Sequence, residues 1–350
     1  MDTNQAKDMV IRAGVELVKR GLIARTWGNV SQRLDEKTMV ITPSGKGYLS
    51  LKRQDIVPVD ISTLEYTGEV KPSSEKAVHA SCYRLKGAQF VIHTHQVNAS
   101  VVSACGIAGF DCDKKRYPLL GGRVVLADYG LPGTKKLNAG VEKALNKTQG
   151  HAIIMKHHGA LCFGESYEEA FEAATQLEEA SQAYIEEKYK QVSGDQSAEY
   201  EAMGKFVLSQ NADLKDTPKA RGAESEVKNP NDIINTNASV MALSYMKKPL
   251  YPMLDDFAQI VGVDMKADND SAKKRARLLK HANAVFIKGA GVLCTGPTSD
   301  DAQAVSMIVE KNCKAYIGAR LHGKVKPINR FESRLMRMVY KMKYSKQMTS

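Results

Sequence analysis

Two histidines one residue apart, His93 and His95, are the side chains of this sequence best placed to do chemistry. They lie at the end of residues 89–95, a run rich in β-forming residues that predicts a strand. Side chains two positions apart on a strand leave the same face of the sheet. The two imidazoles are therefore expected to share one metal ion.

A third imidazole is available from His157 or His158, which follow a second strand-like run at residues 151–156. Glu75 adds a carboxylate at the start of a predicted helix. Three imidazoles, with or without a carboxylate, suit zinc at about 2.0–2.2 Å and leave positions open for substrate oxygens. Each of these elements alone is weak evidence for a metal site. A glutamate at a helix start, for example, usually complements the helix dipole.

Small residues form two further motifs, Gly-Asn-Val-Ser at residues 28–31 and Thr-Pro-Ser-Gly at residues 42–45. We interpret both as turns whose backbone N–H groups and hydroxyls can hold an anion. Ser73 and Ser74 add donors just before the predicted helix at Glu75. A plain turn or an N-cap explains each motif when it is considered alone.

Together these residues resemble the class II aldolase and adducin family. This family includes fuculose- and rhamnulose-phosphate aldolases, ribulose-phosphate 4-epimerases and methylthioribulose-phosphate dehydratase. The resemblance covers about residues 5–190. It rests on motifs that occur in the family's order and at about its spacing, at residues 28–31, 42–45, 72–75, 93–95 and 157–159.

The resemblance implies a role for individual residues. It makes His93, His95 and His158 the zinc ligands, and His158 is preferred over His157 because the family's ligand directly precedes the glycine. Glu75 becomes the acid/base and a further metal ligand when substrate is absent, and Mn²⁺ or Co²⁺ are alternative ions. In the related aldolases a tyrosine from a neighbouring subunit is the second proton donor, for which Tyr117 and Tyr129 are candidates. The implied phosphate-binding residues are Gly28, Asn29, Ser44, Gly45, Ser73 and Ser74.

The activity implied by the resemblance is zinc-dependent retro-aldol cleavage of a ketose 1-phosphate to dihydroxyacetone phosphate and an aldehyde. A 4-epimerase or a dehydratase on the same zinc platform is an alternative, and so is a non-catalytic, adducin-like scaffold. The expected partners are a small sugar phosphate and further copies of the chain, with a tetramer as the first expectation.

The predicted elements that position these residues are helices and strands that alternate along the chain. Helices are predicted at residues 8–22, 75–86, 99–105, 138–146 and 168–190, and strands at residues 39–42, 89–95, 123–127 and 151–156. This order favours an α/β or α+β sandwich over a helical bundle. The resemblance implies a layered sandwich with a central, mostly antiparallel sheet flanked by helices.

The C-terminal part of the chain partly repeats this pattern. Residues 284–296 are similar in sequence to residues 152–164, and Tyr251 and Pro252 correspond to Tyr117 and Pro118. We therefore predict a catalytic domain at residues 1–190, a polar linker or excursion at 191–238 and a degenerate half-repeat with a basic tail at 239–350. Ala290 occupies the position of His158, so no catalytic zinc is expected in the second copy.

Composition sets the broad class of the protein. The chain has 350 residues and 43% hydrophobic residues, enough for a substantial core. No apolar run approaches the roughly 18–20 residues of a membrane span and no signal-peptide core opens the chain, so a cytoplasmic protein without a membrane partner is expected. The six cysteines are scattered, as buried free thiols would be.

The net charge of +11 is concentrated at the C-terminus, where residues 320–350 carry nine Lys or Arg against one acid, Glu332. Residues 330–346 have the apolar spacing of an amphipathic helix with a cationic outer face. A solvated helix explains this pattern better than a membrane or nucleic-acid surface, because aromatic stacking platforms are scarce there.

Overall fold

The computed structural model describes residues 2–23, 27–210, 229–268, 272–323 and 325–347. The chain divides into two compact units. The first unit comprises residues 1–103 and 107–184, and the second comprises residues 104–106 and 185–350.

The first unit is built on an eight-stranded sheet in the order β3-β2-β1-β4-β8-β7-β6-β5. Every neighbouring pair is antiparallel except β6 and β7, so the predicted mostly antiparallel sheet is confirmed. The strands are β1 (Asn29–Arg33), β2 (Thr38–Ile41), β3 (Val57–Asp60), β4 (Phe90–Thr94), β5 (Gly109–Asp111), β6 (Arg123–Ala127), β7 (Ala152–Met155) and β8 (Ala160–Gly164).

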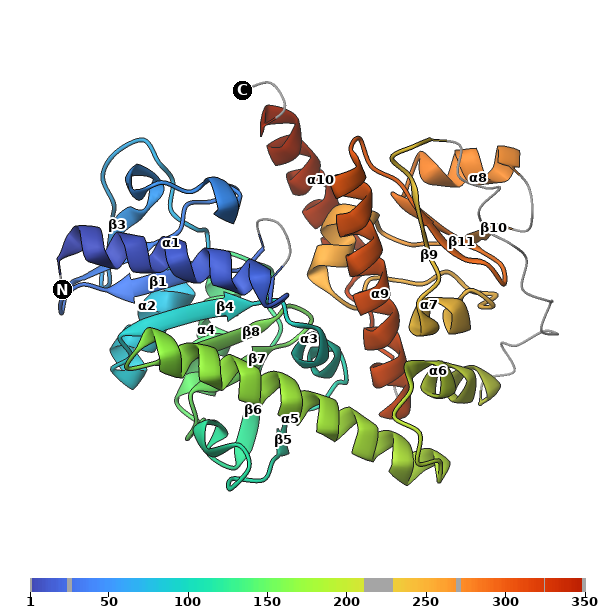
Figure 1. Cartoon of the computed structure of the whole chain (residues 1–350), viewed down its shortest axis with the longest axis horizontal. Helices are drawn as coiled ribbons and strands as arrows, with labels where there is room; N and C mark the ends of the chain where they lie inside the picture. Colours follow the sequence, from blue (N-terminus) through green and yellow to red (C-terminus); the bar gives the residue numbers. More distant parts are fainter. Residues whose placement is uncertain (1, 24–26, 211–228, 269–271, 324, 348–350) are drawn as a thin grey trace. The chain divides into compact units, whose positions relative to one another are not determined.

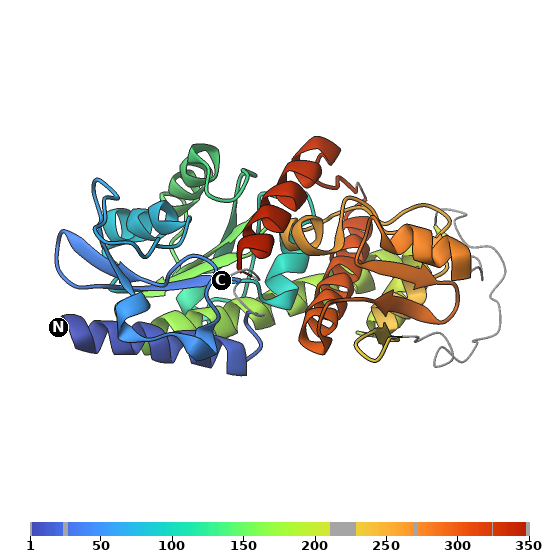
Figure 2. The same cartoon turned by 90° about the horizontal axis from the view of Figure 1, so that it is seen from above.

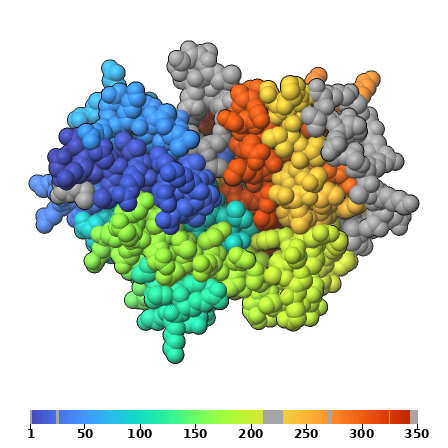
Figure 3. Space-filling view, viewed as in Figure 1, coloured from blue at the N-terminus to red at the C-terminus, as the bar shows by residue number. Residues whose placement is uncertain are grey.

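Helices cover both faces of this sheet (Figures 1 and 2). On one face α1 and α5 lie side by side, as the space-filling view also shows (Figure 3), and Arg12 of α1 stacks over the ring of Tyr167 in α5. On the other face α2 packs against α4. The helices are α1 (Thr3–Lys19), α2 (Lys76–Lys86), α3 (Val97–Ser103), α4 (Lys135–Leu145) and α5 (Tyr167–Ser193), with short 3₁₀ turns at Tyr48–Ser50, Arg53–Asp55 and Pro118–Leu120.

Side chains that point to one face of the sheet fill the layer between the sheet and the helices α2 and α4. Val91, Ile153 and Leu161 point into this layer and meet Val78 of α2 and Val141 of α4. All five side chains are buried, and burial of each such side chain contributes about 1.5–3 kcal/mol. This packing fixes α2, and with it Glu75, against the sheet.

The prediction that residues 28–31 form a turn is wrong. Asn29 begins the central strand β1, in which Ser31 pairs with both Ile41 and Val91. Gly28, at φ +82°, precedes the strand, and a Cβ there would lie 2.5 Å from the His93 carbonyl oxygen. The glycine is thus required by the close approach of β1 to β4, which a sequence pattern of small residues does not reveal.

The second unit contains a four-stranded sheet in the order β10-β11-β12-β9. Helix α9 packs on one face of it, while Leu278 and Leu279 of α8 pack against Val285 and Ile287 on the other. Its elements are α6 (Tyr200–Ser209), β9 (Ile233–Asn235), α7 (Ala238–Leu243), a π-helix at Phe257–Val261, β10 (Ala267–Asp268), α8 (Ala272–Leu279), β11 (Ala284–Ile287), β12 (Gly291–Cys294), α9 (Ser299–Leu321) and α10 (Arg330–Gln347).

Part of the stretch 191–238, predicted as a polar linker or excursion, has regular structure. Helix α6 and strand β9 lie within it, and residues 211–228 lie outside the described part of the chain. Met203, Val207 and Leu208 of α6 are buried, and Gly204 lets the helix approach Ala242 of α7 closely. The polar composition of the stretch concealed this short apolar helix.

The predicted C-terminal amphipathic helix is present as α10, which packs against the π-helix at Phe257–Val261. Arg337 donates to the carbonyl oxygen of Gln259 at 2.8 Å and to Oδ1 of Asn283 at 2.9 Å, so one of the tail's cations serves the fold. All six cysteines are free thiols, and Cys112 alone of them is partly exposed. No described helix combines the length and apolar character of a membrane span.

The turn between β7 and β8 requires a glycine at position 159, and a substitution can test this requirement. A Cβ on Gly159 would lie 2.2 Å from the Thr94 carbonyl oxygen. We expect Gly159→Ala to lower the free energy of unfolding by about 1–3 kcal/mol, because the strands must separate to admit the methyl group. Urea unfolding followed by the fluorescence of Trp27, the single tryptophan, measures this in the first unit.

Gly47→Ala is the control, since the nearest atom to its Cβ would be the Ser50 hydroxyl oxygen at 3.8 Å. It should stay within about 0.5 kcal/mol of the wild type. Equal stability of the two variants would contradict the steric argument.

Candidate active site

Three histidines from two parts of the sheet converge at one edge of the first unit. His93 lies near the end of β4, His95 follows directly after that strand, and His158 lies in the turn between β7 and β8. The ligand atoms of the three lie within 4.8 Å of one another, and all three residues are buried. The two strands meet because β8, which follows the turn, pairs with β4, with His93 opposite Leu161.

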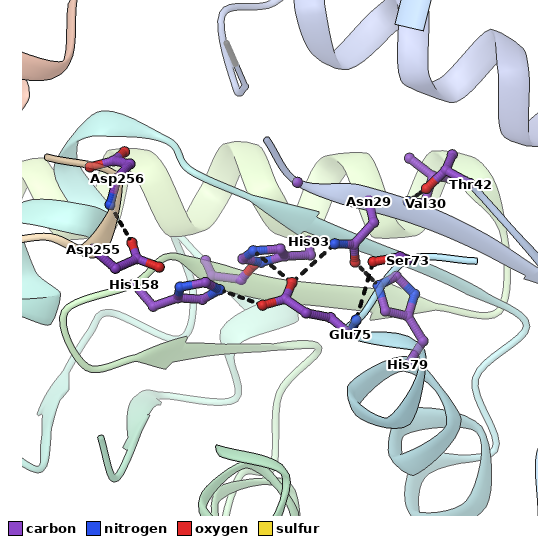
Figure 4. A network of polar contacts seen from close by, with 12 residues as sticks. Asn29, Val30, Thr42, Ser73, Glu75, His79, His93, His158, Asp255 and Asp256 are labelled. Atoms are coloured by element: carbon purple, nitrogen blue, oxygen red, sulfur yellow. Dashed lines mark hydrogen bonds and ion pairs between the residues drawn. The ribbon is translucent and has the colours of Figure 1, made fainter. Parts of the chain in front are cut away.

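Glu75, the residue before α2, carries its carboxylate into this cluster (Figure 4). Oε1 of Glu75 lies 2.9 Å from Nε2 of His158, and Oε2 lies 3.3 Å from Nε2 of His93. The side-chain amide of Asn29 donates to Oε2 at 3.0 Å. The structure thus brings together all four predicted metal ligands and one predicted phosphate-binding residue.

The hydrogen bonding of His93 shows what this cluster is suited to hold. Its Nδ1 lies 2.8 Å from the carbonyl oxygen of Ala160, which only accepts, so Nδ1 carries the proton. Nε2 of the neutral ring then presents a lone pair to the Glu75 carboxylate, another acceptor, and has no hydrogen-bond partner among the described residues. A cation placed among these acceptors satisfies them, so the residues fit a divalent metal ion.

The charge states follow from burial and from these contacts. Burial alone raises the pKa of Glu75, but its interactions with His158 and the hydrogen bond from Asn29 outweigh this effect, and the pKa lies well below its ordinary value. Burial lowers the pKa of His93 well below its usual range. The cluster is therefore an ionised carboxylate beside a neutral imidazole, the form in which both groups bind metal.

A chain of buried side chains continues from Glu75 into the core (Figure 4). Asn29 Oδ1 is hydrogen-bonded to Nε2 of His79, whose Nδ1 lies 2.6 Å from the Ser31 hydroxyl. The Ser31 hydroxyl lies 2.5 Å from the hydroxyl of Tyr83. Every member of this chain is buried, and His79 and Ser31 are fully so.

The carboxylate at one end fixes the direction of the whole chain. An ionised Glu75 only accepts, so Asn29 donates to it through its NH₂ group and accepts through Oδ1. His79 must then donate from Nε2 and accept at Nδ1 from Ser31, which accepts in turn from Tyr83. This requires a neutral His79, and burial lowers its pKa to about 4. All four donors point toward Glu75 and stabilise its negative charge.

The predicted phosphate-binding residues come from two segments that meet beside α2. Pro43 and Pro72 form an isolated β-bridge, and the Ser44 N–H donates to the Lys71 carbonyl oxygen at 2.9 Å. The Ser73 hydroxyl accepts from the Glu75 N–H at 3.2 Å and is buried, whereas Ser44 and Ser74 are more exposed. The segments thus adjoin the positive end of α2, although the Asn29 side chain is engaged by Glu75 and His79.

The two candidate tyrosines lie at opposite ends of β7. Tyr129 follows β6, which runs parallel to β7, so it lies at the same sheet edge as the turn after β7; its ring centroid is 5.5 Å from that of His157. Tyr117 precedes the turn whose Leu119 carbonyl accepts from His151, the residue before β7. Within one chain, Tyr129 is therefore the candidate on the side of the histidine cluster.

Sequence reasoning missed His79, Ser31 and Tyr83 as parts of the site. One usable signal was the four-residue spacing of Glu75 and His79, which places both on one side of α2. Ser31 stands in the 28–31 motif but was interpreted as part of a turn. No local pattern links Tyr83 to Ser31, because their contact depends on how α2 packs on the sheet.

The known proteins that this chain is similar to match its first half. Residues 8–185 match the family model for the class II aldolase and adducin N-terminal domain. Among solved structures, an L-fuculose 1-phosphate aldolase is 30% identical over 51% of this chain and 84% of its own, with a TM-score of 0.48. The L-fuculose-1-phosphate aldolase of Thermus thermophilus is 26% identical over 54% and 97%, with a TM-score of 0.45.

A third similar structure is YgbL of Klebsiella pneumoniae, whose description leaves aldolase, epimerase and decarboxylase activity open. It is 23% identical over 52% of this chain and 89% of its own, with a TM-score of 0.47.

The neutral state of His79 predicts a specific pH dependence of stability. Its pKa is about 4 in the folded protein and about 6.5 when unfolded, so below pH 6.5 the unfolded state binds more protons. Stability from this group is therefore complete above pH 6.5 and is lost as the pH falls toward 4. Between pH 7 and pH 5 we expect a loss of about 2 kcal/mol from this residue.

Urea unfolding of the wild type and of His79→Gln at both pH values, followed by Trp27 fluorescence, measures this difference. The variant should be less stable at pH 7 but should lose about 2 kcal/mol less on going to pH 5. His151→Gln, which changes a partly exposed histidine of the same unit, is measured in parallel as the matched substitution outside the buried chain. Parallel slopes for His79→Gln and the wild type would show that His79 does not titrate in this way.

Proposed function

The chain belongs to the class II aldolase and adducin family, and from this premise we propose that it is a metal-dependent lyase that cleaves a ketose 1-phosphate to dihydroxyacetone phosphate and an aldehyde. The observation that carries the proposal is the convergence of His93, His95 and His158 on the ionised carboxylate of Glu75. A scaffold has no chemical need for a buried carboxylate surrounded by imidazoles, and such a cluster is costly to maintain.

The three histidines would hold the ion, for which zinc is the first candidate and Mn²⁺ or Co²⁺ are alternatives. When bound, such an ion supplies Lewis-acid stabilisation of negative charge that develops on substrate oxygens. The Ala160 carbonyl fixes the tautomer of His93 so that Nε2 faces the ion position. Retro-aldol cleavage breaks the C3–C4 bond of a ketose, and the electron pair passes to the C2 carbonyl oxygen to give an enediolate.

Glu75 is the group placed to move protons in this reaction. Its carboxylate is buried among the ligand atoms, and the chain from Tyr83 through His79 and Asn29 holds it ionised, ready to exchange a proton with the carbon that becomes the dihydroxyacetone phosphate terminus. As the C3–C4 bond breaks, the C4 hydroxyl loses a proton to become the aldehyde and C3 gains one through Glu75, so no net proton is consumed. We assign the proton transfer at the C4 oxygen to Tyr129, whose hydroxyl would pass on the C4 proton in cleavage and donate to the aldehyde oxygen in the reverse direction. This assignment rests on its position beside His157 at the same sheet edge.

The phosphate of the substrate would bind beside the first turn of α2. Ser44, Gly45, Ser73 and Ser74 lie on two segments joined by the Pro43–Pro72 bridge. Backbone N–H groups at a helix start carry a partial positive charge that favours an anion. Phosphate binding there would orient the sugar carbons toward Glu75. We further expect a cytoplasmic homo-oligomer, with four subunits as the first expectation.

An epimerase or a dehydratase is the second candidate, because the same ligand set serves retro-aldol cleavage without release and the loss of water. Only the lyase releases a triose phosphate, so product analysis separates them.

The decisive experiment combines metal content with product analysis. We expect about one divalent ion per chain in the wild type, and loss of both the ion and dihydroxyacetone phosphate release in His95→Ala, because one of three imidazole ligands is removed. Glu75→Gln should retain the ion on the three histidines while activity falls by about 10²–10⁴. Elemental analysis and a coupled assay on a panel of ketose 1-phosphates measure both quantities.

His151→Ala is the matched control, since it removes a histidine of the same unit that lies before β7 and away from the cluster. It should retain metal and activity. Bound metal without release of triose phosphate would favour the epimerase or dehydratase. Absence of metal from the wild type would favour the non-catalytic scaffold.

A further inference from the structure

His157 precedes the proposed ligand His158 and has an unusual backbone conformation. Its φ of +59° lies in the left-handed region that favours glycine, and Leu64 is the one other non-glycine residue of the described chain with a positive φ. The side chain is partly exposed, so burial in the core does not explain its presence. A non-glycine residue in this region costs conformational energy, and such residues cluster at functional sites.

The second unit contains the same turn with a glycine at this position. In each unit the residue after it, His158 or Ala290, donates its N–H to the carbonyl oxygen three residues earlier, at 3.1 Å and 2.9 Å. Gly289, which corresponds to His157, has φ +72°. The turn therefore forms with glycine at this position, and the histidine side chain is not needed to build it.

Three contacts in succession join the turn of the first unit to the segment after β6. The Lys156 N–H donates to the Ala127 carbonyl oxygen at 3.3 Å, and the Lys156 ammonium lies 3.0 Å from Oδ1 of Asp128. The next residue of each segment continues the series, because the rings of His157 and Tyr129 meet edge to face at 86°, with centroids 5.5 Å apart. This geometry is favourable for an aromatic pair, and it holds the Tyr129 ring against the turn.

His157 is the more rigid of two side chains that contact this ring. Its own backbone is fixed, since its N–H donates to the Ser103 carbonyl oxygen at 3.2 Å. The Lys136 ammonium also lies over the Tyr129 ring, but it is 6.0 Å from the centroid and belongs to an exposed residue with a flexible side chain. The orientation of Tyr129 therefore depends mainly on His157.

Resting on the lyase proposed above, we propose that His157 is a positioning residue for Tyr129. Its ring fixes the orientation from which the Tyr129 hydroxyl exchanges a proton with the C4 oxygen, and His157 itself exchanges none. The turn thus carries a metal ligand and, one residue earlier, the group that orients the tyrosine. The role is the same whether Tyr129 serves its own subunit or a neighbouring one. It explains why a histidine stands where the second unit has glycine.

Steady-state kinetics of His157→Asn test this proposal, because asparagine tolerates the left-handed conformation and removes only the ring. We expect kcat to fall by about 10- to 10²-fold, since a misplacement of about 1 Å has an effect of this size. KM should change by less than about twofold and the metal content should be that of the wild type. In a Tyr129→Phe background the same substitution should cause no further loss of kcat, because the hydroxyl that His157 positions is already absent.

Two further variants separate the ring from other effects. His157→Phe keeps an aromatic ring at this position and should recover most of the kcat that His157→Asn loses. His151→Asn, the matched control, changes a partly exposed histidine before β7 and should leave kcat unchanged. Circular dichroism verifies that each variant is folded, and elemental analysis verifies that it holds its metal ion.

Crystal structures of the wild type and of His157→Asn test the contact without any catalysis. We expect one orientation of the Tyr129 ring in the wild type, and a rotated or disordered ring in the variant. An inactive wild type would end the lyase proposal, whereas this comparison would still decide whether His157 holds Tyr129.

Four results would overturn the proposal. They are a wild-type kcat in His157→Asn, an equal loss in the Tyr129→Phe background, loss of the metal ion from His157→Asn, and a Tyr129 ring that is equally ordered and unmoved in both crystals. The third result would assign the effect of the substitution to His158 instead.

Discussion

The negative charge of Glu75 is the constraint on which the first unit depends. A buried carboxylate is tolerated only when hydrogen bonds and nearby positive or polarisable groups replace the water that it has lost. Here the Asn29 amide and the His158 imidazole take that role. The polar chain that ends at Tyr83 aligns every donor toward the carboxylate, so the site extends from the sheet edge into the core.

The sheet topology brings together the groups that surround this carboxylate. β4 lies at the centre of the sheet, between β1, which supplies Asn29, and β8, which leads back to His158. Close strand approach at Gly28 and Gly159 lets both neighbours reach the end of β4. Helix α2 then needs only to pack Val78 and Tyr83 against the sheet to place Glu75. A site built on rigid strands in this way holds its ligands in one geometry.

The sequence predicted the main parts of this arrangement for identifiable reasons. His93 and His95 were found because spacing on a strand is a local property, and α2 and β4 were found because their periodicity is strong. β1 was missed because its Gly-Asn start signals a turn, whereas its strand character comes from pairing with β2 and β4. His79 was missed for a related reason. On a helix it resembles a core residue, and its role appears only once Ser31 and Asn29 are placed on either side of it.

The repeat separates the structural part of the His-Gly motif from its chemical part. Gly159 and Gly291 lie in turns of the same shape, and in each a Cβ would lie 2.2 Å from the carbonyl oxygen of the facing strand, that of Thr94 or Asn235. Only the first of these turns carries a histidine at the preceding position. The glycine is therefore required by strand packing in both units, whether or not a histidine precedes it. The residue before the glycine is under no such steric constraint, since the same turn accepts His158 in the first unit and Ala290 in the second.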